Sequence, residues 1–450
     1  MVRRIITSIL RLTLRVYFRR IEVTGTENVP RDSPVIFVLN HPNALVDPVF
    51  LLCLAPRRVA FIAKAPLFRM PVIGYLVRAL DSLPAYRRQD EGEDVSRNLE
   101  TFAAARELLT RGVAIGICPE GVSHNEPRLK PLKTGAARIA LAAASSDEDI
   151  NLQIVPAALY YTEKTSFRSS ALLHFAKPIS VAPVMLEPDG TPPRMEVREL
   201  SSQIEKAMRD VMLHAEQEEA LVLIDRAERI FSAEEIGEPD EEQRLDRSLR
   251  LRQRFLAGYA FYHKHAPRRI DAIESRISVF EQELCQAGID PSDLSLHSTA
   301  AGTILSLLAR ILTCASMAPF ALFGAVVHYP AYRLAGYLSR RLGTEQDVLS
   351  TFKIISAMLL FPLTWISAAL IAEALTGWMV AFVFFVLVPL CGYVAVRFFE
   401  EIDQFLGSLA ALSMFMMRRR FFVRLLAERA AIRREILALG EDARHESFSR

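Results

Sequence analysis

Three long apolar stretches in the last third of the 450-residue chain limit its fold more than any other feature of the sequence. They cover residues 303–327, 354–375 and 377–396. Each is about as long as a helix must be to cross roughly 30 Å of hydrocarbon. Because the second stretch runs almost directly into the third, we expect residues 354–396 to form a transmembrane helical hairpin. The sequence therefore predicts an integral membrane protein.

Basic residues flank this hairpin and predict its orientation. The positive-inside rule places them in the cytoplasm, so we expect a basic cytoplasmic segment at 331–353 and a cytoplasmic basic helical tail at 397–450. The first apolar stretch contains Arg310 and Pro319, a charge and a helix breaker. We therefore predict that 301–330 is re-entrant or interfacial and does not span, which keeps the N-terminal part of the chain on the cytoplasmic face. The flanking cations are Arg333, Arg340, Arg341 and Lys353 before the hairpin, and Arg397, Arg418, Arg419 and Arg420 after it.

The first twenty residues hold six Arg and no acidic residue. Apolar residues and Arg alternate irregularly there, without the uninterrupted apolar run or the cleavage site of a signal peptide. We predict that 1–20 forms a basic amphipathic helix on an anionic membrane surface. A helix packed against the rest of its domain is the alternative.

Between residues 21 and 193, short β-rich runs alternate with helical periods. Strands separated by crossover helices are typical of an α/β fold with a mixed, mostly parallel sheet flanked by helices. From 194 to 300 the period is almost wholly helical, which predicts an all-α region before the apolar stretches. The predicted strands are 34–39, 59–63, 113–118, 153–160 and 171–175, and the predicted helices of the α/β domain are 48–54, 95–110 and 135–144.

Charge and cysteine content exclude other classes. Lys and Arg number 54 against 52 Asp and Glu, and this balance argues against a nucleic-acid binder. The five cysteines lie far apart and lack the spacing of a disulfide framework or a Cys/His metal site. We predict no metal site and no cofactor.

Chemistry is first indicated by the string Asn40-His41-Pro42-Asn43-Ala44-Leu45-Val46-Asp47-Pro48, directly after the run PVIFVL. A histidine at a strand end, with an acid in the same turn, can be held in one tautomer by that carboxylate. Its other ring nitrogen can then deprotonate a hydroxyl. A structural loop histidine is an equally good reading of this string alone.

A second string, Cys118-Pro119-Glu120-Gly121-Val122-Ser123, also follows an apolar strand. Ligands of α/β folds bind at the carboxyl ends of parallel strands, so the two strings are expected to share a crevice. Glu120 could bind a substrate hydroxyl, and Gly121 permits a close approach of the backbone. The cations Lys64, Arg87, Arg88, Lys133 and Arg168 lie in the same part of the sequence and could bind a phosphate.

Together these strings resemble the glycerolipid acyltransferase superfamily, the lysophosphatidate and glycerol-3-phosphate acyltransferases. Its usual His-x4-Asp block is His-x5-Asp here, a spacing that resembles the fungal-type glycerol-3-phosphate/dihydroxyacetone-phosphate acyltransferase branch. Three departures are the missing Gly of the second block, Cys118 in place of Phe, and that longer spacing. The other blocks match Leu83–Arg87, Cys118–Ser123 with Lys133-Thr134-Gly135, and Ile154–Tyr161, and Phe167–Ser170 is similar to the fungal-type branch.

The resemblance implies a glycerol-3-phosphate acyltransferase-like fold. It also implies a reaction of phospholipid biosynthesis, in which an acyl group is transferred from a thioester of CoA or acyl carrier protein to a hydroxyl of glycerol 3-phosphate. His41 and Asp47 would be the catalytic pair. The expected partners are membrane lipids and the acyl donor, not nucleic acid; the oligomeric state is left open. Substrate binding would use Arg87, Glu120, Gly121, Ser123, Lys133 and Arg168.

Two alternatives remain open at this stage. The acceptor could be 1-acylglycerol 3-phosphate (lysophosphatidate) or another lysophospholipid. The chain could also be a membrane lipid-binding scaffold without activity. An α/β-hydrolase-like esterase is excluded because the chain has no Gly-x-Ser-x-Gly elbow.

Overall fold

The computed structural model describes residues 1–124, 126, 128–145, 150–213, 218–231, 244–287, 300–343, 345–417 and 419–448. The chain divides into two compact units. The first consists of Met1–His214 together with Gly343–Ile354, and the second of Ala215–Leu342 with Ile355–Arg450. The first unit therefore includes a short segment from the apolar last third of the sequence.

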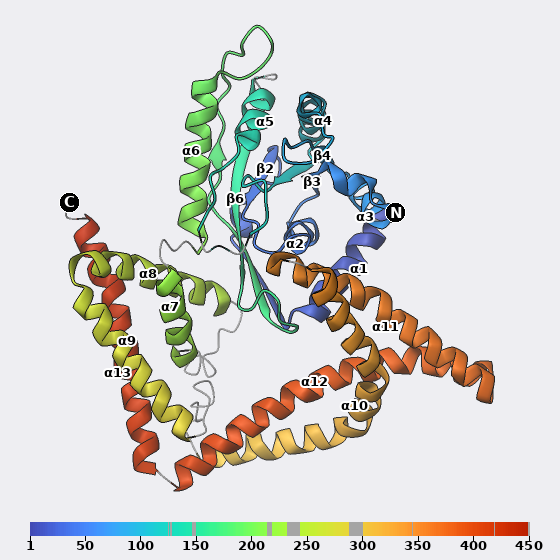
Figure 1. Cartoon of the computed structure of the whole chain (residues 1–450), viewed down its shortest axis with the longest axis vertical. Coiled ribbons are helices and arrows are strands. Elements are labelled where there is room, and N and C mark those ends of the chain that lie inside the picture. Colours follow the sequence, from blue (N-terminus) through green and yellow to red (C-terminus); the bar gives the residue numbers. More distant parts are fainter. Residues whose placement is uncertain are drawn as a thin grey trace. The chain divides into compact units, whose positions relative to one another are not determined.

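An eight-stranded sheet forms the centre of the first unit, in the order β1-β7-β6-β2-β5-β3-β4, with β8 paired to β6 (Figure 1). Only the pairs β6–β7 and β6–β8 are antiparallel. The prediction of a mixed, mostly parallel sheet is thus confirmed. The strands are β1 (Arg20–Thr24), β2 (Val35–Leu39), β3 (Val59–Lys64), β4 (Leu83–Ala85), β5 (Ala114–Ile117), β6 (Gln153–Tyr161), β7 (Ser170–Phe175) and β8 (Ile179–Ser180).

All five strands predicted from the sequence are present, whereas β1, β4 and β8 were missed. β1 carries Glu22 in its centre, and β4 is three residues long with Pro84 in the middle. Neither pattern is typical of a strand. Pairing with a neighbouring strand, and not local composition, makes these segments extended.

Helices cover both faces of the sheet, because side chains of a strand point alternately to its two sides. Ile36 and Val38 of β2 pack into a core with α4 (Asn98–Thr110), α5 (Gly135–Ala144) and α6 (Arg194–Val211). Val35, Phe37 and Leu39 pack into a second core with α1 (Val2–Tyr17) and α2 (Val46–Leu54). A further helix, α3 (Pro71–Ala79), and three short 3₁₀ helices at Thr26–Asn28, Ala65–Arg69 and Val95–Arg97 complete the unit.

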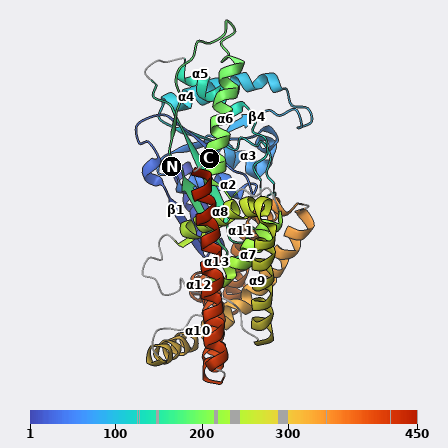
Figure 2. The same ribbon diagram turned by 90° about the vertical axis from the view of Figure 1, so that its left-hand side faces the viewer.

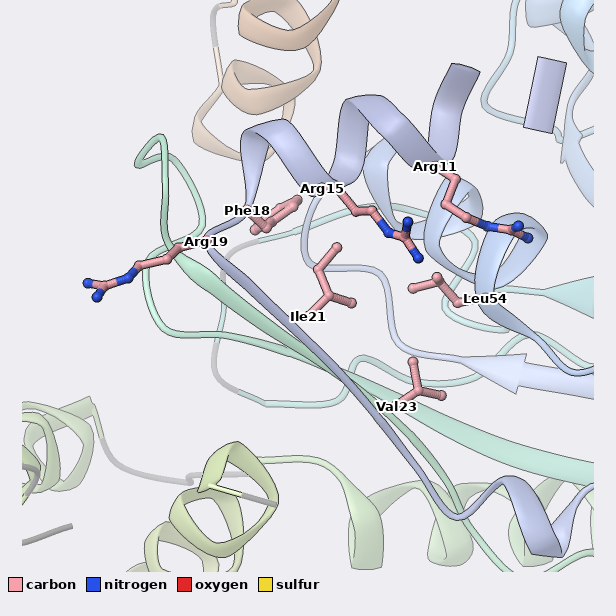
Figure 3. A pocket seen from close by; sticks show the side chains of 7 residues that line it. All are labelled: Arg11, Arg15, Phe18, Arg19, Ile21, Val23 and Leu54. Carbon is pink, nitrogen blue, oxygen red and sulfur yellow. The ribbon is translucent and has the colours of Figure 1, made fainter. Parts of the chain in front are cut away.

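Helix α1 packs on the domain and also exposes an apolar stripe. Leu14, Tyr17 and Phe18 are buried in the second core. A pocket of about 300 Å³ lies beside the helix, where Arg11 and Arg15 approach the apolar side chains of strand β1 and α2 (Figure 3). The exposed stripe consists of Val2, Ile5, Ile9, Leu12 and Val16, spaced to share one helical face. The helix therefore packs on the domain through one face, and its position on a membrane surface stays a prediction.

The second unit is helical in its described residues, apart from the breaks at Ala266 and Gly377. Helices α8, α9 and α13 pack together (Figure 2). Arg276 of α9 pairs with Glu428 and Glu435 of α13. This agrees with the predicted all-α region. The helices are α7 (Glu218–Phe231), α8 (Arg244–His265), α9 (Pro267–Ala287), α10 (Ala300–Leu342), α11 (Gln346–Thr376), α12 (Trp378–Met417) and α13 (Arg419–Phe448), the start of α11 belonging to the first unit.

Within the described residues, three helices are long and apolar enough to cross a membrane by length and composition, and they indicate a membrane protein. Two of them, α11 and α12, meet at Gly377, whose φ is +106°. Helix α12 packs along α10, and the hairpin of α11 and α12 stays a prediction. The third, α10, is one continuous helix with Pro319 and Pro330 inside it. A segment that turns back within 301–330 does not fit this continuous helix, and an interfacial position for it stays a prediction.

The predicted boundary at 331–353 also differs from the structure. Residues up to Leu342 continue helix α10, and Gly343–Ile354 join the catalytic unit. The sequence showed only the positive charge of this segment. Its burial against the α/β domain depends on contacts with residues far away in the chain.

Candidate active site

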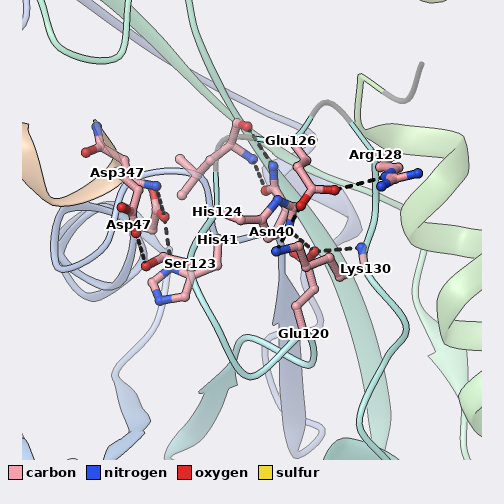
Figure 4. A network of polar contacts seen from close by, with 12 residues as sticks. Asn40, His41, Asp47, Glu120, Ser123, His124, Glu126, Arg128, Lys130 and Asp347 are labelled. Atoms are coloured by element: carbon pink, nitrogen blue, oxygen red, sulfur yellow. Dashed lines mark hydrogen bonds and ion pairs between the residues drawn. The ribbon is translucent and has the colours of Figure 1, made fainter. Parts of the chain in front are cut away.

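The loop after β2 brings His41 and Asp47 together. His41 Nδ1 lies 2.9 Å from Asp47 Oδ2 (Figure 4). Asn40 fixes the start of the loop, because its side chain donates to the carbonyl of Leu159 and accepts from the Leu159 amide at 3.0 and 2.7 Å. The loop is thereby tied to the neighbouring strand β6.

Three donors hold the Asp47 carboxylate, which is fully buried. Besides the His41 ring, the Asn43 amide donates to Oδ2 at 2.7 Å and the Tyr161 hydroxyl donates to Oδ1 at 2.7 Å. A buried carboxylate needs such donors, because leaving it unpaired is costly. The long His-x5-Asp spacing is accommodated by Ala44, whose φ is +37°. Asp47 therefore still reaches the ring despite the longer spacing.

The electrostatics of His41 suit a proton acceptor. Burial acts to lower the pKa of His41, whereas the hydrogen bond with Asp47 and the negative charge of that carboxylate act to raise it, and the pKa of His41 lies well above its usual value. Asp47 engages Nδ1, so Nε2 is the nitrogen left to act as the base. The Cys118 thiol beside the ring is itself buried, and burial raises the pKa of Cys118, which keeps it protonated.

The second predicted string forms the loop after β5. Glu120 is 2% exposed, and its Oε2 accepts hydrogen bonds from the His124 ring and, at 3.0 Å, from the Lys130 amide. Gly121 has a φ of +73°, a conformation that favours glycine. The Gly121 carbonyl accepts a hydrogen bond from Arg87, which also binds Asp90 through two nitrogens at 2.7 and 2.8 Å.

The two loops meet, as expected for the carboxyl ends of neighbouring parallel strands. Strands β2 and β5 pair in parallel, and the His124 amide donates to the His41 carbonyl at 3.2 Å. Ser123 donates to the carboxylate of Asp347, in the first turn of α11 (Figure 4). Residues of three separate parts of the sequence therefore surround His41.

Lys133 and Arg168, the two cations besides Arg87 that were assigned to substrate binding, lie in different surroundings. Lys133 is exposed, and its side chain covers Gly121, where a Cβ atom would lie 3.3 Å from the Lys133 Cγ. Arg168 points its guanidinium at the C-terminal end of α1, within 3.3–3.4 Å of the Arg15, Val16 and Phe18 carbonyls. This geometry gives Arg168 a capping role. Its predicted part in substrate binding is not needed to explain its position.

Three polar residues of the site had no role in the sequence reading: Tyr161, His124 and Asp347. Tyr161 ends the buried strand β6 and also ends the block Ile154–Tyr161 that resembles the family, and this block was its sequence signal. His124 directly follows the second string. Asp347 lies 224 residues after its partner Ser123, and no local pattern links the two. Within the described ranges, no group of three His, Cys, Asp or Glu side chains could hold a metal ion.

A buried His-Asp pair beside a Pro-Glu-Gly loop, at the carboxyl edge of a mostly parallel sheet, defines the class of the protein as a glycerolipid acyltransferase fold. Residues 20–160 match the family model "Acyltransferase". Residues 236–443 match the model "Glycerol-3-phosphate acyltransferase 2 C-terminal domain". The two models together cover most of the α/β domain and most of the helical region.

Individual relatives agree with these family models. Glycerol-3-phosphate O-acyltransferase 2 of Saccharomyces cerevisiae is 27% identical over 61% of this chain and 38% of its own length. Glycerol-3-phosphate O-acyltransferase 1 of the same yeast is 23% identical over 78% of this chain and 58% of its own length. The chain therefore spans less than two thirds of these relatives. It belongs to the glycerol-3-phosphate/acylglycerol-phosphate acyltransferase family, on the branch of the yeast enzymes.

A solved structure is also similar, the 1-acyl-sn-glycerophosphate acyltransferase PlsC from Thermotoga maritima. It is 20% identical and covers 46% of this chain and 80% of its own, with a TM-score of 0.33. Similarity at this level carries no argument about the substrate.

Proposed function

We propose that this protein transfers an acyl group from an acyl-CoA or acyl-carrier-protein thioester to a hydroxyl of glycerol 3-phosphate. The observation that carries the proposal is the His41–Asp47 pair, with Asp47 fully buried and held by three donors. Such a pair fixes one histidine tautomer and orients the other nitrogen toward a hydroxyl. The names of the yeast relatives favour glycerol 3-phosphate as the acceptor.

The reaction follows from this geometry. His41 Nε2 removes the proton of the glycerol hydroxyl while the oxygen attacks the thioester carbonyl carbon. Asp47 stabilises the imidazolium that forms. The tetrahedral oxyanion then collapses, the carbon–sulfur bond breaks, and the imidazolium returns its proton to the departing thiolate. The products are the ester and a free thiol, and His41 is again neutral.

The Pro-Glu-Gly loop is the proposed site for the glycerol phosphate. Glu120 and Gly121 lie beside His41 on the loop after β5, and Ser123 and Lys133 border the same turn. Lys133 is exposed and could meet an incoming phosphate. Arg87 shapes the loop through its bond to the Gly121 carbonyl and would contribute positive charge.

Purified full-length enzyme, assayed with labelled acyl-CoA and separate acceptors, tests this proposal. We expect esterification of glycerol 3-phosphate, and loss of roughly 10²- to 10⁴-fold in the His41→Ala variant. Product formed only from lysophosphatidate would replace the acceptor, and activity that persists without His41 would refute the mechanism. A wild-type protein that binds lipid but acylates neither acceptor would identify a scaffold.

We also propose that the catalytic unit lies on the cytoplasmic face and that helix α1 rests on the membrane surface. Support comes from the basic ends of the hairpin and from the exposed apolar stripe of α1. Leu12→Cys, on the stripe, should react several-fold more slowly with a water-soluble maleimide in nanodiscs than in detergent. Ser8→Cys, which is exposed on the polar side, is the matched control and should react equally in both. Equal rates for both variants would contradict the surface position.

A further inference from the structure

We infer that the first two turns of helix α11 are a structural part of the active site, and that Asp347 and Ser350 position the catalytic His41–Asp47 pair. The inference rests on the proposed function of that pair. It assigns a role to Gly343–Ile354, a segment that lies within the C-terminal family match and belongs to the catalytic unit in the structure.

The first contact connects α11 to His41. The Ser123 hydroxyl donates to the Asp347 carboxylate, and the next residue, His124, donates its amide to the His41 carbonyl at 3.2 Å. A carboxylate in the first turn of a helix is favoured by the helix dipole whether or not it has a partner. Asp347, however, is only 4% exposed, and a buried carboxylate requires a donor such as Ser123.

The second contact connects α11 to Asp47. Ser350, which is fully buried, donates to the Lys164 carbonyl at 2.5 Å, and the Asn43 side chain donates to the same oxygen at 3.4 Å. The Asn43 amide in turn holds Asp47 Oδ2. His41 is thus two hydrogen bonds away from a residue of α11, and Asp47 is three away.

Further contacts hold the segment in place. Lys353 Nζ donates to the Thr165 carbonyl at 2.5 Å, and Ile354 packs against the core formed by α1 and α2. The charges of two acidic groups also act on the side chain of Lys164. Burial lowers the pKa of Lys164, while the carboxylates of Asp47 and Asp347 act in the opposite direction. The loop that carries Lys164 therefore connects α11 with the catalytic pair by charge as well as by hydrogen bonds.

The consequence is a dependence of acyl transfer on a helix that continues to Thr376 as one of the three apolar helices. Residues that only orient His41 and Asp47 should affect the rate of the chemical step, because misplacing a base raises the barrier without removing a substrate contact. Binding of the thioester donor should change little.

The test uses the full chain in nanodiscs with the variants Asp347→Asn, Ser350→Ala and Ser123→Ala. Asp347→Asn should lower kcat about tenfold, the size of one lost hydrogen bond to a charged group, with an unchanged KM for the donor. Ser123→Ala should have a similar effect, and the double variant should be no slower than the slower single variant, because both changes remove one interaction. Glu345→Gln, an exposed acid two residues before Asp347, is the matched control and should keep the wild-type kcat.

Hydrogen exchange provides a readout that does not depend on activity. Asp347→Asn should increase amide exchange in 120–124, Ser350→Ala in 162–169, and Glu345→Gln in neither. Any of three results would overturn the inference. Asp347→Asn could keep the wild-type kcat, the effects of Ser123→Ala and Asp347→Asn could multiply independently, or amide exchange could be unchanged in the variants. A wild-type enzyme that acylates no acceptor would instead refute the proposed function, and the exchange data would still decide whether α11 holds the two loops.

Discussion

The loops after β2 and β5 meet beside His41 but are stabilised in different ways. The β2 loop is held by groups that belong to it or to the adjacent strand β6: the Asn43 amide, the Tyr161 hydroxyl and the Leu159 backbone. The β5 loop is held from outside, by Arg87 at Gly121 and by Asp347 at Ser123. The catalytic pair is therefore held mainly from the neighbouring strand of the sheet, whereas the proposed acceptor loop is held by segments outside the two strands that flank β5.

This difference predicts how each loop responds to substitution. A change in the β2 loop acts directly on the catalytic pair and should reduce the rate strongly. A change in the β5 loop should be graded, because several separate contacts share the task of holding it. The following predictions are ordered from the largest expected effect to the smallest.

Replacement of Asp47 by Asn should have the largest effect, a loss in kcat on the order of 10³- to 10⁴-fold. The amide cannot stabilise the imidazolium, and it favours the wrong tautomer of His41. Steady-state acyl transfer by the purified variant measures this loss. A reduction of less than about tenfold would show that Asp47 is structural and that the β2 loop is no more sensitive than the β5 loop.

The pH dependence of kcat/KM should report the neighbours of His41. The base must be neutral, and its pKa is raised well above 6.5, so activity should fall as pH decreases through that raised pKa. Below it, each pH unit should cost about tenfold in rate. Glu120→Gln, in the other loop, should leave the position of this acid limb unchanged. An acid limb at or below pH 6.5 in the wild type would contradict the electrostatic effect of Asp47.

Gly121→Ala tests the backbone of the β5 loop. The φ of +73° should strain an alanine by about 1–2 kcal/mol, which corresponds to a loss in kcat/KM of roughly 5- to 30-fold if the loop shifts. Gly190→Ala is the control, since its φ is +78° and nothing lies within 4 Å of an added Cβ. Both variants should lose similar thermal stability, but only Gly121→Ala should lose activity. Equal activities would mean that the loop tolerates displacement.

Arg87→Lys should have the smallest effect, a two- to fivefold decrease in kcat/KM. Lysine cannot bind Asp90 through two nitrogens and reach the Gly121 carbonyl as well, but it keeps the charge. Arg88→Lys, at an exposed neighbouring position, is the control. A much larger rise in the KM for glycerol 3-phosphate, with kcat unchanged, would instead show that Arg87 binds the phosphate itself.

Local patterns in the sequence determined most of the fold. Strands of the sheet interior, such as β2 and, after Gln153, β6, are almost wholly apolar, and this pattern can be recognised without knowing which strands they pair with. β1 and β4 were missed because only pairing makes them strands. The apolar helices were predicted from length and hydropathy, but the continuity of α10 through Pro319 was not, since packing between helices can accommodate a proline that local rules treat as a breaker.

The active site likewise contains residues that the sequence predicted and residues that only the tertiary structure revealed. The sequence by itself determined His41, Asp47 and the Pro-Glu-Gly turn, because strand ends and spacing along one loop are local properties of the chain. Tertiary structure alone decided that Ala44 absorbs the extra residue, that Tyr161 holds Asp47, and that Arg168 caps α1. It also decided the contact of Asp347 with Ser123 across 224 residues. Such contacts depend on which surfaces the fold brings together, and no spacing in the sequence encodes them.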